Sequence, residues 1–309
     1  MLHITDNNLI ISSRTGCVLM AALSIARGSS FLFSKHLLGN MEPLNLLGLR
    51  FLLAFLILFI LFSRKVITDI RTNPRVIHAS LLLGGVYFLC MAAELIGLQY
   101  TTASTCSFLE NSAIVIVPII EALLLRRFPK PVIVASTVIT FFGIGLIVLR
   151  GSADGTSAGG NIFLGYNLGI GEILCMVAAL MYAAAIVITD RVSKKQDPLT
   201  LGILYVGFMG LLGLIASFVF ETPHIPQSGF DWVMLLALAV LCTAFGFTIQ
   251  PVAQKPLSSE TAGIICAVNP LSTAVLGWIL MGDALGVSGV AGAVLILTGI
   301  LLPNLHPFL

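Results

Sequence analysis

The chain has 309 residues, of which 58% are hydrophobic and only 10% are charged, against about 25% in an ordinary soluble domain. So few charges cannot cover the surface of a soluble protein of this length, and the formal net charge of +2 provides no basic face for nucleic acid. The composition excludes a disordered chain, a soluble enzyme and a nucleic-acid binder, and it predicts a protein that crosses a membrane several times.

Ten segments reach the length of about 20 mostly apolar residues that a membrane-spanning helix needs. Their apolar runs are continuous, which favours helices over the alternating pattern of a β-barrel. We therefore expect an all-α integral membrane protein with ten transmembrane helices. The longest connection, 151–166, is rich in Gly, Ser and Ala and is typical of a flexible linker. The predicted spans are 16–37, 44–63, 76–98, 102–125, 131–149, 167–189, 199–220, 230–252, 257–280 and 285–304.

Lysine and arginine gather on one side of these spans. With the N-terminus inside, the cytoplasmic segments hold 12 of these residues and the outer segments hold two, Lys35 and Arg150. The positive-inside rule then places both termini in the cytoplasm. We expect a multi-pass protein of the cell membrane, that is, the inner or plasma membrane.

The second half of the sequence repeats the first. At a shift of 155 residues, Met41-Glu42-Pro43-Leu44 aligns with Gln196-Asp197-Pro198-Leu199, and at 156 residues 100–105 align with 256–261. The two repeats cover 15–150 and 166–305, with five spans each. Because five is odd, the second repeat must be inverted relative to the first. Inverted repeats are typical of secondary transporters, whose substrate site lies near the bilayer midplane where the repeats meet.

Several short motifs support a family assignment. They are Gly28-Ser29-Ser30-Phe31, Arg50-Phe51-Leu52-Leu53-Ala54, Gly97-Leu98-Gln99-Tyr100-Thr101-Thr102-Ala103-Ser104, Glu260-Thr261-Ala262-Gly263, Asn269-Pro270-Leu271 and Leu280-Met281-Gly282-Asp283. With them the chain resembles the EamA branch of the drug/metabolite transporter (DMT) superfamily over nearly its whole length. The resemblance implies a ten-helix transporter with a central cavity that moves amino acids, amines, drugs or other small metabolites, often outward.

Two residues depart from the family pattern. Arg27 stands where the family usually has Trp, and Glu110 stands where an uncharged residue is common. Both departures indicate a substrate unlike that of a generic member.

Ionisable side chains inside spans are costly, at least ~2.5–3.5 kcal/mol each at the bilayer centre, and are functional candidates for that reason. The first half holds five of them, and the second half has no counterpart at similar depth. Two buried ion pairs that fix helix packing would also explain four of the five. Glu121 lies near the cytoplasmic rim, where Arg126 or Arg127 could pair with it. The five residues are Arg27, Arg50, Glu94, Glu110 and Glu121.

Helical spacing and the repeat extend this set. Tyr87 shares a helix face with Glu94, and the repeat maps Arg27 onto Tyr182 and Glu94 onto Gln250. Pro270 frees a backbone carbonyl beside Asn269. We therefore expect the substrate-binding residues to be Arg27, Tyr87, Glu94, Glu110, Tyr182, Gln250 and Asn269, while Arg50 and Glu121 serve as structural or coupling charges.

These residues predict a secondary active transporter, an exporter of a small polar metabolite, amine or amino-acid-like substrate. Glu94 and Glu110 would bind a cationic group. Burial disfavours a charged carboxylate, so one of them could take up a proton and couple export to proton entry. Arg27 could receive a substrate carboxylate, or it could only neutralise Glu110. The alternative is a lipid-carrier flippase, or its accessory subunit, in which Arg27 and Arg50 bind a lipid phosphate.

An enzyme is not expected, because the sequence contains no P-loop, GxSxG or HExxH motif. The six cysteines form no CxxC pair, so we expect neither a metal nor a cofactor. The expected partners are a small-molecule substrate and membrane lipids, without nucleic acid. Small-xxx-small pairs in the last span leave both a monomer and a homodimer open.

Overall fold

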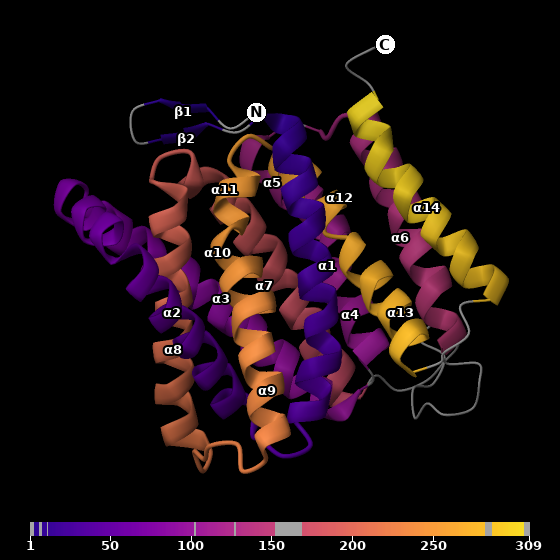
Figure 1. Ribbon diagram of the computed structural model, residues 1–309. Helices are drawn as coiled ribbons and strands as arrows, with labels where there is room; N and C mark the ends of the chain where they lie inside the picture. The colour runs from indigo at the N-terminus through magenta and orange to yellow at the C-terminus, as the bar shows by residue number, and fades with distance from the viewer. Residues whose placement is uncertain are drawn as a thin grey trace.

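The computed structural model describes residues 3–5, 8–10, 12–101, 103–126, 128–151, 169–281 and 286–305. Within these ranges the chain is a bundle of ten helical rods (Figure 1). A short antiparallel hairpin, β1 (His3–Thr5) and β2 (Asn8–Ile10), precedes the first helix. The sequence did not predict this hairpin, but the all-α fold with ten spans is confirmed.

Each half of the chain supplies five rods. The first half contains α1 (Ser13–Leu37), α2 (Pro43–Thr72), α3 (Arg75–Tyr100), a fourth rod in two pieces, α4 (Ala103–Asn111) and α5 (Ala113–Leu125), and α6 (Pro131–Gly151). The second half contains α7 (Ile170–Ser193), α8 (Pro198–Phe220), an eighth rod in four pieces, a ninth rod in two, and α14 (Gly286–Leu305). The eighth rod is α9 (Gly229–Ala237), the π-helix η1 (Leu238–Phe245), α10 (Gly246–Thr248) and α11 (Gln250–Gln254), and the ninth is α12 (Ser259–Ile265) and α13 (Val268–Met281).

Seven helical stretches within the described ranges are long and apolar enough to cross a membrane, and two more, 131–146 and 290–302, are shorter apolar helices. The predicted linker, apart from Gly151, lies outside the described residues. One helix is longer than predicted: α2 continues to Thr72, beyond a kink at Phe62. Lys65 lies past that kink and bonds both Asp69 and Asp197, which ties the extension to the start of α8.

Helix starts follow local chemistry. Pro43 and Pro198 begin α2 and α8, where a missing backbone N–H costs nothing. The side chains of Ser12, Asp197 and Ser258 accept hydrogen bonds from backbone N–H groups in the first turns of α1, α8 and α12.

The packing obeys a pseudo-twofold relation between the halves. The helices α2 and α8, which are equivalent, pack against each other, and so do α6 and α14. The contact of α1 with α13 matches that of α7 with α5, and the contact of α3 with α7 matches that of the eighth rod with α1. Gly48 and Gly213 bring α2 and α8 close together, since an added Cβ on Gly48 would lie 2.7 Å from the Leu214 backbone nitrogen.

Both ends of the bundle can be identified from contacts. The start of α1 meets the end of the eighth rod, where Ser13 Oγ donates to the Pro256 carbonyl at 3.4 Å. On the opposite face, Asn45 donates to the His224 carbonyl at 2.6 Å. The start of α1 and the end of α14 lie on the same face (Figure 1). A chain that crosses the bundle an even number of times ends on the face where it began.

Candidate functional site

Two rods are interrupted at equivalent points of the repeat. The first-half interruption lies at Ser112, between α4 and α5, and the second-half one lies at Cys266 and Ala267, between α12 and α13. A shift of 155 residues maps Ser112 onto Ala267. Discontinuous helices at corresponding places in the two halves are the usual position of a transporter's binding site.

Prolines in the eighth and ninth rods leave two backbone carbonyl groups without their usual helical hydrogen-bond partner. Pro251 has no N–H to offer the Phe247 carbonyl, which accepts instead from the Tyr205 hydroxyl. Pro270 likewise frees the Cys266 carbonyl, which accepts from the Asn269 N–H at 2.9 Å. The backbone is therefore satisfied locally while the rods change direction at the centre of the protein.

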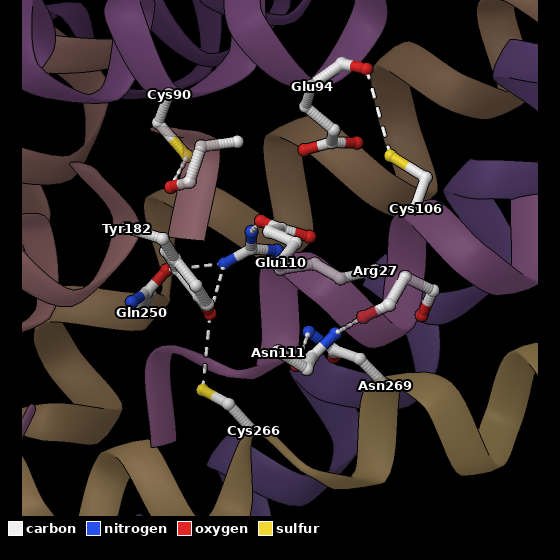
Figure 2. Close-up of polar contacts among 12 residues, drawn as sticks. Arg27, Cys90, Glu94, Cys106, Glu110, Asn111, Tyr182, Gln250, Cys266 and Asn269 are labelled. Carbon is white, nitrogen blue, oxygen red and sulfur yellow. Dashed lines mark hydrogen bonds and ion pairs between the residues drawn. The ribbon is translucent and has the colours of Figure 1, made fainter. Parts of the chain in front are cut away.

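Arg27 is the hub of a buried polar cluster at this level (Figure 2). One terminal nitrogen, Nη1, donates to the Tyr182 hydroxyl at 2.6 Å and to Gln250 Oε1 at 3.4 Å. The other, Nη2, lies 3.4 Å from Glu110 Oε1 and forms an ion pair with it. The Arg27 side chain thus joins both halves of the chain. Its partner Tyr182 occupies the position in the second repeat that Arg27 occupies in the first.

Aromatic rings enclose the Arg27 guanidinium. Its central carbon lies 4.5 Å from the ring centres of both Tyr182 and Phe247. Tyr87 stacks on Tyr205 with 5.2 Å between ring centres and meets the edge of Phe247 at 5.7 Å. Cation–π contacts in a water-poor site are worth about 2 kcal/mol. These rings help to fix the guanidinium, which the single ion-pair contact alone would leave free to move.

The two glutamates of the cluster are buried and incompletely paired. Glu110 is fully buried and Glu94 is 2% exposed. The carboxyl group of Glu94 points towards that of Glu110 (Figure 2). Glu110 Oε1 contacts Arg27, but Glu110 Oε2 and Glu94 Oε2 have no hydrogen-bond partner among the described residues. Buried polar atoms are normally paired, so unpaired oxygens on two facing carboxyl groups can be satisfied by a proton shared between the groups or by a ligand.

Arg50 lies beside the same aromatic ring without joining the ion pair. Its Nε donates to Thr243 Oγ1 at 2.6 Å, and its guanidinium carbon is 5.9 Å from the Phe247 ring centre. The terminal nitrogens Nη1 and Nη2 are buried, and no residue in the described part of the chain bonds them. Of the two ion pairs considered from the sequence, Arg27–Glu110 forms, whereas Arg50 and Glu94 do not bond each other.

A second polar contact joins the fourth and ninth rods. Asn269 Nδ2 donates to Asn111 Oδ1 at 3.4 Å, while Asn269 Oδ1 is buried without a partner. The Tyr182 hydroxyl, which accepts from Arg27, donates onward to Cys266 Sγ at 3.2 Å. Hydrogen bonds therefore run from the Arg27 cluster to the interruption of the ninth rod.

The cluster brings together most of the residues selected from the sequence. Arg27, Glu110, Tyr182 and Gln250 are in direct contact, Glu94 faces Glu110, and Tyr87 packs on the same rings; Asn269 lies on the neighbouring asparagine pair. Sequence reasoning missed Asn111, Thr243, Phe247 and Cys266. A signal existed for Phe247 and Cys266, which lie four residues before Pro251 and Pro270.

Glu121 lies elsewhere, and its partner differs from the expected one. Glu121 Oε2 is 3.8 Å from Arg191 on α7, rather than paired with Arg126, while Arg127 lies outside the described residues. The reason is geometric: Arg126 has a left-handed backbone conformation at the end of α5, which turns it off the helix face of Glu121. Glu121 therefore connects the two halves at the rim, away from the cluster.

Two thiols meet beside the cluster. Cys175 Sγ donates to Cys106 Sγ at 3.0 Å, and both side chains are fully buried. They belong to α7 and α4, so this contact also lies between the halves. Within the described ranges no group of three or more His, Cys, Asp or Glu side chains could hold a metal ion.

Two equivalent halves of five helices, with interrupted rods and a buried charge cluster where they meet, define a membrane transporter fold. The profile of the EamA-like transporter family matches residues 14–149 and 169–305, one domain in each half. The chain therefore belongs to the EamA-like transporter family of the DMT superfamily, which is a transporter family and not an enzyme family.

Named proteins and a solved structure resemble the chain. An uncharacterized transporter of Archaeoglobus fulgidus is 26% identical over 304 residues, which is 94% of this chain and 98% of that protein. The threonine/homoserine exporter RhtA of Salmonella typhimurium is 30% identical over 121 residues, 37% of this chain and 38% of RhtA. The S-adenosylmethionine/S-adenosylhomocysteine transporter of Chlamydia muridarum is 23% identical over 83% of this chain and 81% of its own length. One crystal structure shares the fold with a TM-score of 0.71 at 16% identity, covering 95% of both chains.

Proposed function

We propose that this protein is a secondary active transporter that exports a small polar metabolite with a cationic group across the cell membrane. The observation that carries the proposal is the pair of free, buried carboxylate oxygens, Glu94 Oε2 and Glu110 Oε2, at the meeting point of the two halves. A substrate ammonium would supply the donors that these oxygens lack.

The cluster is closed to solvent in this structure. Arg27 is 5% exposed, and Glu94, Glu110 and Gln250 are 2% exposed or less. A substrate reaches such a site only when the halves move apart on one side of the membrane, which is the alternating movement expected of an inverted repeat. The free glutamate oxygens can hold a proton when the substrate is absent, so we expect a proton to be the coupling ion.

The relatives support the substrate class. Two of them are named for their cargo, which is threonine and homoserine for RhtA and S-adenosylmethionine and S-adenosylhomocysteine for the chlamydial transporter. Each of these molecules carries an ammonium group that can donate to a carboxylate. The excess of Lys and Arg on the face where α1 starts supports an orientation with both termini in the cytoplasm.

The test is uptake into proteoliposomes that contain the purified protein. The probes are radiolabelled threonine, homoserine, S-adenosylmethionine and putrescine, each with and without an opposing proton gradient. We expect at least one of these probes to accumulate, with uptake accelerated by the gradient.

The Glu110→Gln variant should lose most of the transport, because it removes the negative charge and keeps the side-chain shape. Glu42→Gln is the matched control: it makes the same change at an exposed carboxylate before α2, and it should transport like the parent protein. Equal transport by the parent and Glu110→Gln would reject a cation-binding role for Glu110. Transport that ignores the proton gradient would reject proton coupling alone.

A further inference from the structure

Arg50 is the most incompletely paired charged side chain of the cluster. It is 1% exposed, and its Nε is anchored to Thr243 Oγ1, which itself donates to the Leu238 carbonyl at 3.0 Å. The guanidinium lies over Phe51 at 5.1 Å and near Phe247 at 5.9 Å. None of the residues that the structure describes accepts from Nη1 or Nη2. The Arg50 side chain is therefore held at Nε, while its terminal nitrogens Nη1 and Nη2 are available to a ligand.

Arg27 differs from Arg50 in this respect. Its terminal nitrogens already contact Tyr182, Gln250 and Glu110, and two rings cover its faces. A ligand that bound Arg27 would have to displace one of these partners, whereas a ligand that bound Arg50 would displace none. The two arginines therefore have different tasks, although both are buried and both lie near Phe247.

The unpaired acceptors of the cluster lie within electrostatic range of Arg50. Glu94 and Glu110 both attract its guanidinium without bonding it, and each keeps one free buried oxygen. The closed cluster thus contains two unpaired donors, Arg50 Nη1 and Nη2, and two unpaired acceptors, Glu94 Oε2 and Glu110 Oε2. A guanidinium fork fits the two oxygens of a carboxylate in a bidentate manner, and free carboxylate oxygens fit an ammonium group.

We propose that Arg50 Nη1 and Nη2 bind the carboxylate of the substrate while the free oxygens of Glu94 and Glu110 bind its ammonium, so that the site takes a small zwitterion such as an α-amino acid. This inference rests on the proposed transport function and specifies its substrate. Arg27 is then a positioning residue that holds Glu110 and Gln250 in place.

Charge balance favours a zwitterion over other ligands. When Arg27, Arg50, Glu94 and Glu110 are all ionised, their charges cancel. A zwitterion keeps that balance in a site that excludes water. A plain amine, a plain acid or a doubly charged phosphate would each leave a net charge buried, which is costly.

The experiment compares ligands that differ in one group. Purified protein is screened for thermal stabilisation by the standard L-amino acids. For each amino acid that binds, the carboxyamide, which lacks the acid, and the hydroxy acid or des-amino acid, which lacks the ammonium, are measured as well. We expect the parent protein to bind the zwitterion about 10- to 100-fold more tightly than its amide, as the loss of charged hydrogen bonds predicts.

The Arg50→Gln variant should reduce the ratio of zwitterion to amide affinity to about one. Arg27→Gln should weaken both ligands and keep the ratio, and Glu42→Gln, at an exposed position before α2, should change neither. Arg50→Lys, which keeps the charge and loses the fork, should give an intermediate ratio and provides the test if Arg50→Gln does not fold.

Three results would overturn the inference: an unchanged ratio in Arg50→Gln or Arg50→Lys, no stabilisation of the parent by any amino acid, or tighter binding of O-phosphoethanolamine than of amino acids. The last result would indicate a phosphate-bearing substrate. Transport of amines with an intact Glu110 requirement would retain the proposed function while rejecting the zwitterion site, so the two failures are distinguishable.

Discussion

Removing Arg27 alone from the Arg27–Glu110 pair should destabilise the protein more than removing both charges. Arg27→Gln leaves the fully buried Glu110 without its cationic neighbour and also breaks the 2.6 Å bond to Tyr182. Breaking a buried ion pair from one side costs about 3–5 kcal/mol. The pair has a single contact at 3.4 Å instead of a bidentate one, so we expect a loss near the lower end, about 3 kcal/mol.

Glu110→Gln should cost less. The amide oxygen still accepts from Arg27, which keeps Tyr182 and both aromatic rings, so about 1–2 kcal/mol is expected. The double variant contains no unbalanced charge at this contact, and it should be more stable than Arg27→Gln alone. The coupling free energy between the two positions should therefore be about 2 kcal/mol.

The assay is reversible unfolding in mixed detergent micelles, followed by circular dichroism for the parent, both single variants and the double variant. The Arg191–Glu121 pair at the rim provides a matched cycle with the same glutamine substitutions. Its atoms are 3.8 Å apart and Arg191 is half-exposed, so its coupling should stay below about 1 kcal/mol. Additive effects at Arg27 and Glu110, or equal coupling in the two cycles, would refute the reasoning.

Three further predictions concern other parts of the molecule. Hydrogen bonds to the Asn40 and Thr222 carbonyls raise the pKa of His224, so its stabilising contribution is complete below the unfolded value of about 6.5 and disappears as pH rises through the higher folded value. The melting temperature should fall over that range, and His224→Gln should remove the slope; an unchanged slope would contradict the assignment. Mild oxidation with copper phenanthroline should join Cys106 to Cys175 and stop transport, and mass spectrometry of the peptides reports the link; transport by fully cross-linked protein would show that these rods keep their contact throughout the cycle. A membrane-impermeant thiol reagent applied outside cells should label Gln227→Cys but not Asn73→Cys in a background without native cysteines; the reverse pattern would invert the orientation.

Hydropathy and the repeat predicted the fold well, because both depend on composition over about 20 residues. Span boundaries agree where a proline or a cap begins a helix, as at Pro43 and Pro198. The extension of α2 to Thr72 was missed because its polar residues lower the hydropathy while Val66 still packs into the core. The interruptions were missed, except near Pro270, because hydropathy does not register the partner of each backbone carbonyl.

The site was predictable where it involved charge and symmetry. A buried arginine and glutamate at the same depth had to be close, and the repeat correctly linked Arg27 with Tyr182. Thr243 as the anchor of Arg50 was not predictable, because it depends on the π-helix that turns the eighth rod. Arg191 as the partner of Glu121 depends on how α5 meets α7, which no local pattern encodes.

The contact between Arg27 and Tyr182 has a consequence for the ancestry of the protein. These residues are equivalent in the two halves and lie 2.6 Å apart, hence close to the axis that relates the halves. In a homodimer of a single five-helix ancestor, a residue at this place would face its own copy across the twofold axis. Two arginines there would repel each other and two tyrosines would carry no charge. The arginine–tyrosine pair requires two different residues at one position, so this contact needs two copies of the five-helix unit that have diverged from each other.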